Sequence, residues 1–107
     1  MPQLTASPSI RDMQQYVALL EAERGFDTDN TLQKCLLLAE EVGELFKSIR
    51  KGEAGIALDV EYTHEADPGA ELADIFTVLM TIANRLNIDL EHAFRRKEDQ
   101  NRHRVWR

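Results

Sequence analysis

Apolar residues recur every three or four positions through most of the chain, which is the spacing of an α-helix. No stretch alternates between polar and apolar residues over the length of a strand. The pattern predicts four helices, over about 9–24, 31–51 and 68–86 and from residue 89 onward. The expected fold class is therefore all-α, with a four-helix bundle-like protomer.

Residues at the ends of these stretches are typical of helix caps. Ser9 can cap the first helix, with Asp12 three residues later as a variant of the capping box. Gly25 suits the end of that helix, because glycine readily adopts the left-handed conformation found there. Asp67 and Asp89 can cap the third and fourth helices. We expect residues 52–68 to form a loop with at most a short helix.

The second predicted helix is apolar around most of its circumference. A helix of this kind is usually central in a fold and covered on several sides. Its remaining polar strip consists of Lys34, Glu41, Glu44 and Ser48. Gly43 lies between the two acids, where the missing side chain would let a neighbouring helix or an ion approach closely.

Two acidic pairs dominate the candidate chemistry: Glu41-x-x-Glu44 in EEVGEL, and Glu71-x-x-Asp74 in ELADIF. Residues three apart share one face of a helix, and like charges at that spacing destabilise an isolated helix by a few tenths of a kcal/mol. Only Glu44 has a basic residue, Lys47, three or four positions later. A cation between the helices would remove the repulsion. Because no His or Cys accompanies the carboxylates, Mg²⁺ or Mn²⁺ is favoured over Zn²⁺.

Length and composition favour one soluble domain over residues 1–107. The chain has 107 residues, of which 43% are hydrophobic and 30% charged, as in globular proteins. The single cysteine, Cys35, excludes an internal disulfide. No signal peptide or apolar run of membrane-spanning length is recognisable, so we expect a cytoplasmic protein without a membrane partner. The net charge of −6 argues against a nucleic-acid binder.

The charge is uneven, because residues 95–107 hold six basic and two acidic residues, a net charge of +4. One interpretation is a solvated helix end, where cations suit the helix dipole. The other is an element that contacts phosphate. Lys97, Asn101 and Arg104 have the spacing i, i+4, i+7, which would place them on one helix face.

The order of these motifs resembles a known family. EEVGEL followed by ELADIF, with 26 residues between Glu44 and Glu71, is similar to the E-x-x-E…E-x-x-D signature of MazG-like, all-α nucleoside triphosphate pyrophosphohydrolases. KEDQNRHRVW is similar to the K-x-x-x-N-x-x-R tail of many members, so the resemblance covers about residues 31–106. The motif occurs once, unlike in the long two-domain form of MazG.

This resemblance implies hydrolysis of a nucleoside triphosphate between its α- and β-phosphates, giving a nucleoside monophosphate and pyrophosphate. It implies that Glu41, Glu44, Glu71 and Asp74 hold Mg²⁺, and that one of them, with Glu41 as a candidate, accepts a proton from the attacking water. Lys34, Lys97, Asn101 and Arg104 are the candidate substrate-binding residues. The resemblance also implies a homodimer or homotetramer that completes the bundle.

Two other functions are compatible with the same residues. The phosphoribosyl-ATP pyrophosphohydrolase of histidine synthesis has a similar acidic pattern, so the substrate could differ. A non-catalytic helical interaction module could keep the acids to bind a structural cation or a basic partner. Release of pyrophosphate with Mg²⁺ separates the enzymes from the module.

Overall fold

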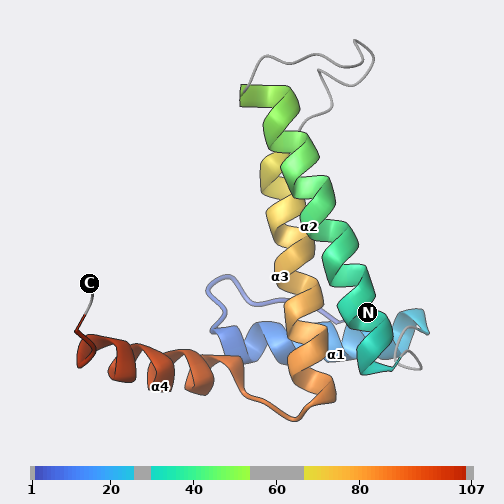
Figure 1. Cartoon of the computed structure of the whole chain (residues 1–107). Coiled ribbons are helices and arrows are strands. Elements are labelled where there is room, and N and C mark those ends of the chain that lie inside the picture. The colour runs from blue at the N-terminus through green and yellow to red at the C-terminus, as the bar shows by residue number, and fades with distance from the viewer. Residues whose placement is uncertain (1, 26–29, 54–66, 106–107) are drawn as a thin grey trace. The chain divides into compact units, whose positions relative to one another are not determined.

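The protein was analysed as a computed structural model, in which residues 2–25, 30–53 and 67–105 are described. These residues form four α-helices and no strand, which confirms the all-α prediction (Figure 1). The helices are α1 (Ile10–Arg24), α2 (Thr31–Glu53), α3 (Pro68–Arg85) and α4 (Leu90–Arg102). Most of the loop predicted for residues 52–68 lies outside the described residues, and α2 continues to Glu53. None of the described helices is long and apolar enough to cross a membrane.

The chain divides into two compact units. Unit 1 consists of Met1–Thr31 and Met80–Arg107, and unit 2 consists of Leu32–Leu79. Unit 1 thus contains α1, the end of α3 and α4, whereas unit 2 contains nearly all of α2 and the larger part of α3. The single domain expected over residues 1–107 stays a prediction.

The predicted caps form at three helix starts and one helix end. At α1, the Ser9 hydroxyl accepts a hydrogen bond from the Asp12 backbone N–H (3.0 Å), and the Asp12 carboxylate accepts one from the Ser9 N–H (3.1 Å). Gly25 ends this helix with φ 76°, in the left-handed region. Asp67 accepts from the Ala70 N–H (3.0 Å) and Asp89 from the His92 N–H (3.1 Å). Each cap satisfies a donor that the first turn would otherwise leave free.

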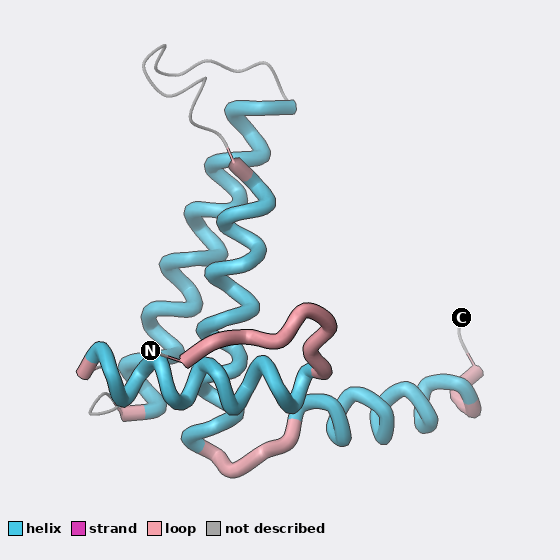
Figure 2. Tube along the Cα trace, turned by 180° about the vertical axis from the view of Figure 1, so that it is seen from behind, coloured by secondary structure: helices cyan, strands magenta, loops and turns pink. Residues whose placement is uncertain are grey.

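Unit 2 is built on α2 and the antiparallel first part of α3, which lie side by side in both views (Figures 1 and 2). Three of the four residues in the polar strip of α2 are at least half-buried, since Lys34 and Ser48 are buried and Glu41 is half-buried, whereas Glu44 is exposed. Large apolar residues of the unit are exposed instead, namely Leu32, Leu36, Phe46 and Ile49 on α2, and Leu72, Phe76 and Leu79 on α3. The cover predicted for the apolar helix is therefore incomplete in a single chain.

Unit 1 combines apolar packing with buried polar groups. Val17, Met80 and Ala83 are buried, each with 5% exposure or less. Glu21 of α1 accepts two parallel hydrogen bonds from the Arg85 guanidinium, both 3.0 Å long. These side chains are only 7% and 17% exposed, so the charges satisfy each other largely away from water. The pair connects α1 to the end of α3.

Candidate metal site

Three carboxylates from α2 and α3 converge in unit 2. Glu41, Glu71 and Asp74 each offer one oxygen, and the three oxygens lie within 4.8 Å of one another. Glu71 and Asp74 share a face because they are three residues apart on α3. Glu41 meets them from α2, thirty residues earlier than Glu71 in the sequence. The structure thus brings together members of both acidic pairs. The sequence alone identified these acids but did not show which of them meet.

The pKa of one of the three carboxyl groups, that of Glu41, is shifted. Glu41 is half-buried, and burial is the largest cause of a raised pKa of its carboxyl group. The charges of Asp74 and Glu71 raise the pKa further, with smaller contributions from Glu40 and Glu44. All five causes disfavour the ionised form of Glu41. A cation among the three oxygens would reverse these electrostatic effects.

The donor set fits a hard divalent cation. All three groups are carboxylates, and oxygen ligands suit Mg²⁺, Mn²⁺ or Ca²⁺. Around one Mg²⁺, with Mg–O distances of about 2.1 Å, opposite ligand oxygens lie about 4.2 Å apart. Because three ligands of one ion cannot all be opposite one another, some ligand oxygens would lie only about 3.0 Å apart. Oxygens that lie within 4.8 Å of one another would therefore have to move closer together to share one Mg²⁺. Mg²⁺ usually takes only part of its shell from protein, which leaves positions for water and phosphate oxygens.

Glu44 lies outside this group in the described part of the chain. It is exposed on α2, three residues after Glu41. At Gly43, a Cβ atom would meet nothing within 4 Å. The predicted approach of a neighbouring helix to Gly43 is therefore not found within the described chain, whereas the approach of an ion stays a prediction. Glu44 stays a predicted ligand, but it is not one of the three carboxylates that converge.

Residues 27–105, most of the chain, match the MazG nucleotide pyrophosphohydrolase domain. The chain belongs to the MazG nucleotide pyrophosphohydrolase family. The match contains both acidic pairs and all of α2, α3 and α4, whereas α1 precedes it. A separate comparison with curated proteins found no matching relative. The family assignment confirms the resemblance on which the activity was predicted.

The basic tail of this MazG-family chain differs from its prediction at one residue. Lys97 and Asn101 lie on α4, but the helix ends at Arg102, so Arg104 is not on the same helix face. The His103 ring nitrogen Nδ1 lies 2.8 Å from the Asp99 carbonyl oxygen, where a continuing helix would place a backbone N–H. The Arg104 N–H bonds the Asn101 carbonyl (3.1 Å), which tightens the last turn.

Lys34 is the candidate substrate residue that shares unit 2 with the carboxylates. It lies seven residues before Glu41, two turns away on the same face of α2. Its side chain is only 5% exposed. Lys97 is exposed and Asn101 half-buried, and both belong to unit 1. The MazG-family tail and the carboxylate group are therefore described as parts of different units.

Proposed function

We propose that this protein is a Mg²⁺-dependent hydrolase that cleaves the α–β phosphoanhydride of ribo- or deoxyribonucleoside triphosphates. The products would be a nucleoside monophosphate and pyrophosphate. The observation that carries the proposal is the convergence of Glu41, Glu71 and Asp74 from two apolar helices. Membership of a nucleotide pyrophosphohydrolase family supplies the substrate class.

The proposed metal ligands are Glu41, Glu71 and Asp74, with Glu44 as a fourth, and Mn²⁺ is an acceptable substitute for Mg²⁺. When bound, the ion supplies positive charge to the phosphate oxygens and makes a bound water more acidic. The carboxylates would hold the ion, and their own negative charges would repel phosphate if the ion did not offset them. Half-burial of Glu41 and Glu71 limits competition from bulk water.

Glu41 is the candidate acceptor of the proton from the attacking water. Without metal, burial and the neighbouring carboxylates raise the pKa of its carboxyl group, but a bound cation would offset this shift. The assignment therefore rests on the place of Glu41 among the three converging carboxylates. Lys97, Asn101 and Arg104 are proposed to contact the phosphates or the sugar, and Lys34 to add a positive charge on the acidic face of α2. Arg104 would do so from the turn after α4 and not from the helix face.

We further propose that the protein is a homodimer or homotetramer. The exposed apolar residues of unit 2 include Leu32, Leu36 and Phe46, which are 69%, 66% and 64% exposed. Apolar patches of this kind on α2 and α3 are costly in water and usually mark an interface. Light scattering should give at least twice the mass of 12.3 kDa. Leu36→Lys and Phe46→Glu together should lower the measured mass, and a monomeric parent would contradict the proposal.

Pyrophosphate release from a panel of nucleoside triphosphates tests the proposed reaction. We expect release with Mg²⁺ for at least one substrate and a decrease of about 100-fold or more with EDTA. The monophosphate should appear in equal amount, since cleavage between the β- and γ-phosphates would give orthophosphate instead. Activity confined to phosphoribosyl-ATP would favour the alternative enzyme. No release from any substrate, with no heat of Mg²⁺ binding, would favour the interaction module.

A further inference from the structure

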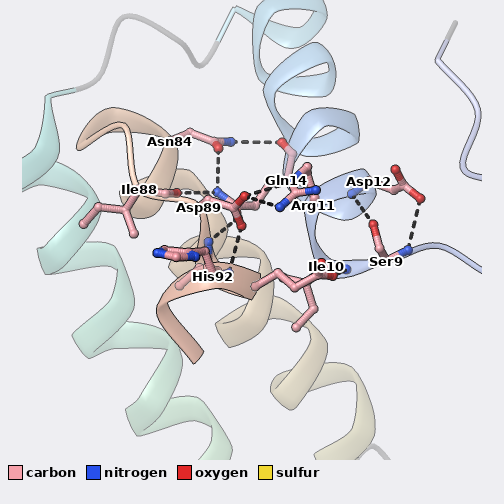
Figure 3. A network of polar contacts seen from close by, with 11 residues as sticks. Ser9, Ile10, Arg11, Asp12, Gln14, Asn84, Ile88, Asp89 and His92 are labelled. Carbon is pink, nitrogen blue, oxygen red and sulfur yellow. Dashed lines mark hydrogen bonds and ion pairs between the residues drawn. The ribbon is translucent and has the colours of Figure 1, made fainter. Parts of the chain in front are cut away.

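Gln14 of α1 is a buried polar residue that the proposed reaction does not use. It is 6% exposed, and its side chain makes hydrogen bonds at both ends of the amide (Figure 3). Nε2 donates to Asn84 Oδ1 (3.0 Å) and to the Ile88 carbonyl (2.9 Å), and Oε1 accepts from the Leu90 N–H (2.7 Å). Asn84 Nδ2 in turn donates to the Gln14 carbonyl (3.0 Å). Gln14 therefore holds together the end of α3, Ile88 of the turn and the first residue of α4.

The first turns of α1 and α4 also cap each other. Leu90 is the first residue of α4, and its N–H is satisfied by Gln14 of α1. Ile10 is the first residue of α1, and its N–H donates to Glu91 Oε1 of α4 (3.2 Å). Such N–H groups have no partner within their own helix. In each helix, the N–H of the first residue thus donates a hydrogen bond to a side chain of the other helix.

An exposed ion pair adds to the same contact. Arg11 Nη2 lies 2.7 Å from Asp89 Oδ2, and Arg11 Nε donates to the same oxygen (2.8 Å). The pKa of Asp89 is lowered, first by the hydrogen bond from the His92 backbone N–H and next by that from Arg11. Because the pair is exposed, it contributes little to stability by itself. The buried amide of Gln14 is the stronger constraint on the turn.

The direction of α4 depends on this turn, because none of the residues of α4 is buried. Asn101 lies eleven residues after Leu90, or about 17 Å along a helix with a rise of 1.5 Å per residue. A tilt of about 10° at the turn would move Asn101 by roughly 3 Å and Lys97 by roughly 2 Å. Displacements of about 1 Å already cost catalytic efficiency where groups must meet a substrate in a fixed geometry.

We propose that Gln14 is a positioning residue that fixes the direction of α4 and thereby places Lys97 and Asn101 against the substrate. The part that concerns substrate rests on the proposed function, because it takes these two residues as phosphate or sugar contacts. The side-chain hydrogen bonds of Gln14 go to Asn84, Ile88 and Leu90, which are neither members of the acidic group nor candidate substrate contacts. It also precedes residues 27–105, to which the family match extends.

Steady-state kinetics tests the effect on substrate. Gln14→Met keeps the length of the side chain and removes its hydrogen bonds. We expect KM for the nucleotide to rise at least fivefold, with kcat and the Mg²⁺ concentration for half-maximal rate unchanged within twofold. Glu21→Gln is the matched control, since it weakens a buried α1–α3 pair and should lower the melting temperature without raising KM. An unchanged KM in Gln14→Met, or an equal rise in Glu21→Gln, would overturn the assignment.

A distance measurement tests the positioning without relying on activity. Spin labels at Ala18 of α1 and Glu98 of α4, both exposed, can be introduced with Cys35→Ser and diluted with unlabelled protein. The parent should give one narrow distance distribution, and Gln14→Met a broadened or shifted one, while Glu21→Gln keeps that of the parent. An unchanged distribution in Gln14→Met would show that Gln14 does not set the direction of α4.

A second variant keeps the test decisive if Gln14→Met does not fold. Gln14→Glu retains the acceptor for the Leu90 N–H and loses the donor to the Ile88 carbonyl. It should change KM and the distance distribution in the same direction by a smaller amount, and no change in either would contradict the proposal. If the parent releases no pyrophosphate, the proposed function fails, but the distance distributions still decide whether Gln14 fixes α4.

Discussion

Asp74→Asn should lower Mg²⁺-dependent pyrophosphate release by about 100-fold or more while leaving the helices intact. The amide has nearly the shape of the carboxylate but carries no charge, so it binds Mg²⁺ poorly. Asp74 is exposed, and its carboxylate is one of three that lie within 4.8 Å of one another. Loss of one charged ligand removes several kcal/mol of transition-state stabilisation, which corresponds to at least two powers of ten in rate. Initial rates and circular dichroism would measure both effects.

Two further variants sharpen this prediction. Glu23→Gln makes the same chemical change at an exposed acid of α1 and should leave the rate within twofold of the parent. Glu44→Gln should lower the rate as Asp74→Asn does if Glu44 is the fourth ligand. Retained activity in Glu44→Gln would restrict the ligands to the three carboxylates that converge. Retained activity in Asp74→Asn would show that the metal assignment is wrong.

Glu41→Gln should have opposite effects on the metal-free and the Mg²⁺-bound protein. Without metal, it removes a carboxylate whose ionised form is disfavoured by burial and by four neighbouring charges, chiefly those of Asp74 and Glu71. Relief of like-charge repulsion of about 0.5 kcal/mol would raise the melting temperature by roughly 2–4 °C. With Mg²⁺ at about 100 times its dissociation constant, the parent would gain about 2.7 kcal/mol from binding. The variant should gain little, so the order of melting temperatures should reverse.

The dependence on pH follows from the raised pKa of Glu41. The folded protein holds this proton more tightly than the unfolded chain does, so the metal-free fold loses stability as pH rises through the raised pKa. The advantage of Glu41→Gln without metal should therefore be present near neutral pH. It should vanish below about pH 4, where the Glu carboxyl group is protonated in both states.

Mg²⁺ binding has the opposite trend, because it requires the ionised carboxylate, and it should weaken as pH falls through the same pKa. Calorimetric melting across pH, with EDTA and with Mg²⁺, measures both trends. Equal stabilisation of parent and variant by Mg²⁺ would place the ion elsewhere.

Local features of the fold were predictable because their causes are local. The side chain of Ser9 meets an N–H three residues away, and Asp67 and Asp89 do the same, so these helix starts follow from the sequence. Gly25 ends α1 because glycine adopts the left-handed backbone conformation at little cost in free energy. The position of Arg104 was predicted wrongly, because α4 ends at Arg102. The contact of the His103 ring with the Asp99 carbonyl accompanies this end, and the spacing of residues in the sequence does not reveal it.

The candidate site was predictable by residue type and only partly by geometry. Glu41, Glu71 and Asp74 were identified because acids without basic neighbours are unusual on apolar helices, and the structure brings their oxygens together. Glu44 was chosen as the second acid of the Glu41-x-x-Glu44 pair, although it has Lys47 three positions later, and it is exposed outside the group. Gln14 was not singled out at all, although it lies between Met13 and Val17 in the first predicted helix. Its partners are 70–76 residues away, so no local pattern marks it.

The sequence by itself determined the four helices, most of their ends and the acids from which a cation site can be built. These depend on side-chain spacing and on hydrogen bonds over three or four residues. Only the tertiary structure decided which carboxylates meet, which face of α2 is exposed, and that α1 and α4 cap each other. These outcomes depend on how segments that are distant in sequence pack together. The local preference of each residue is compatible with many such arrangements, so it does not select one of them.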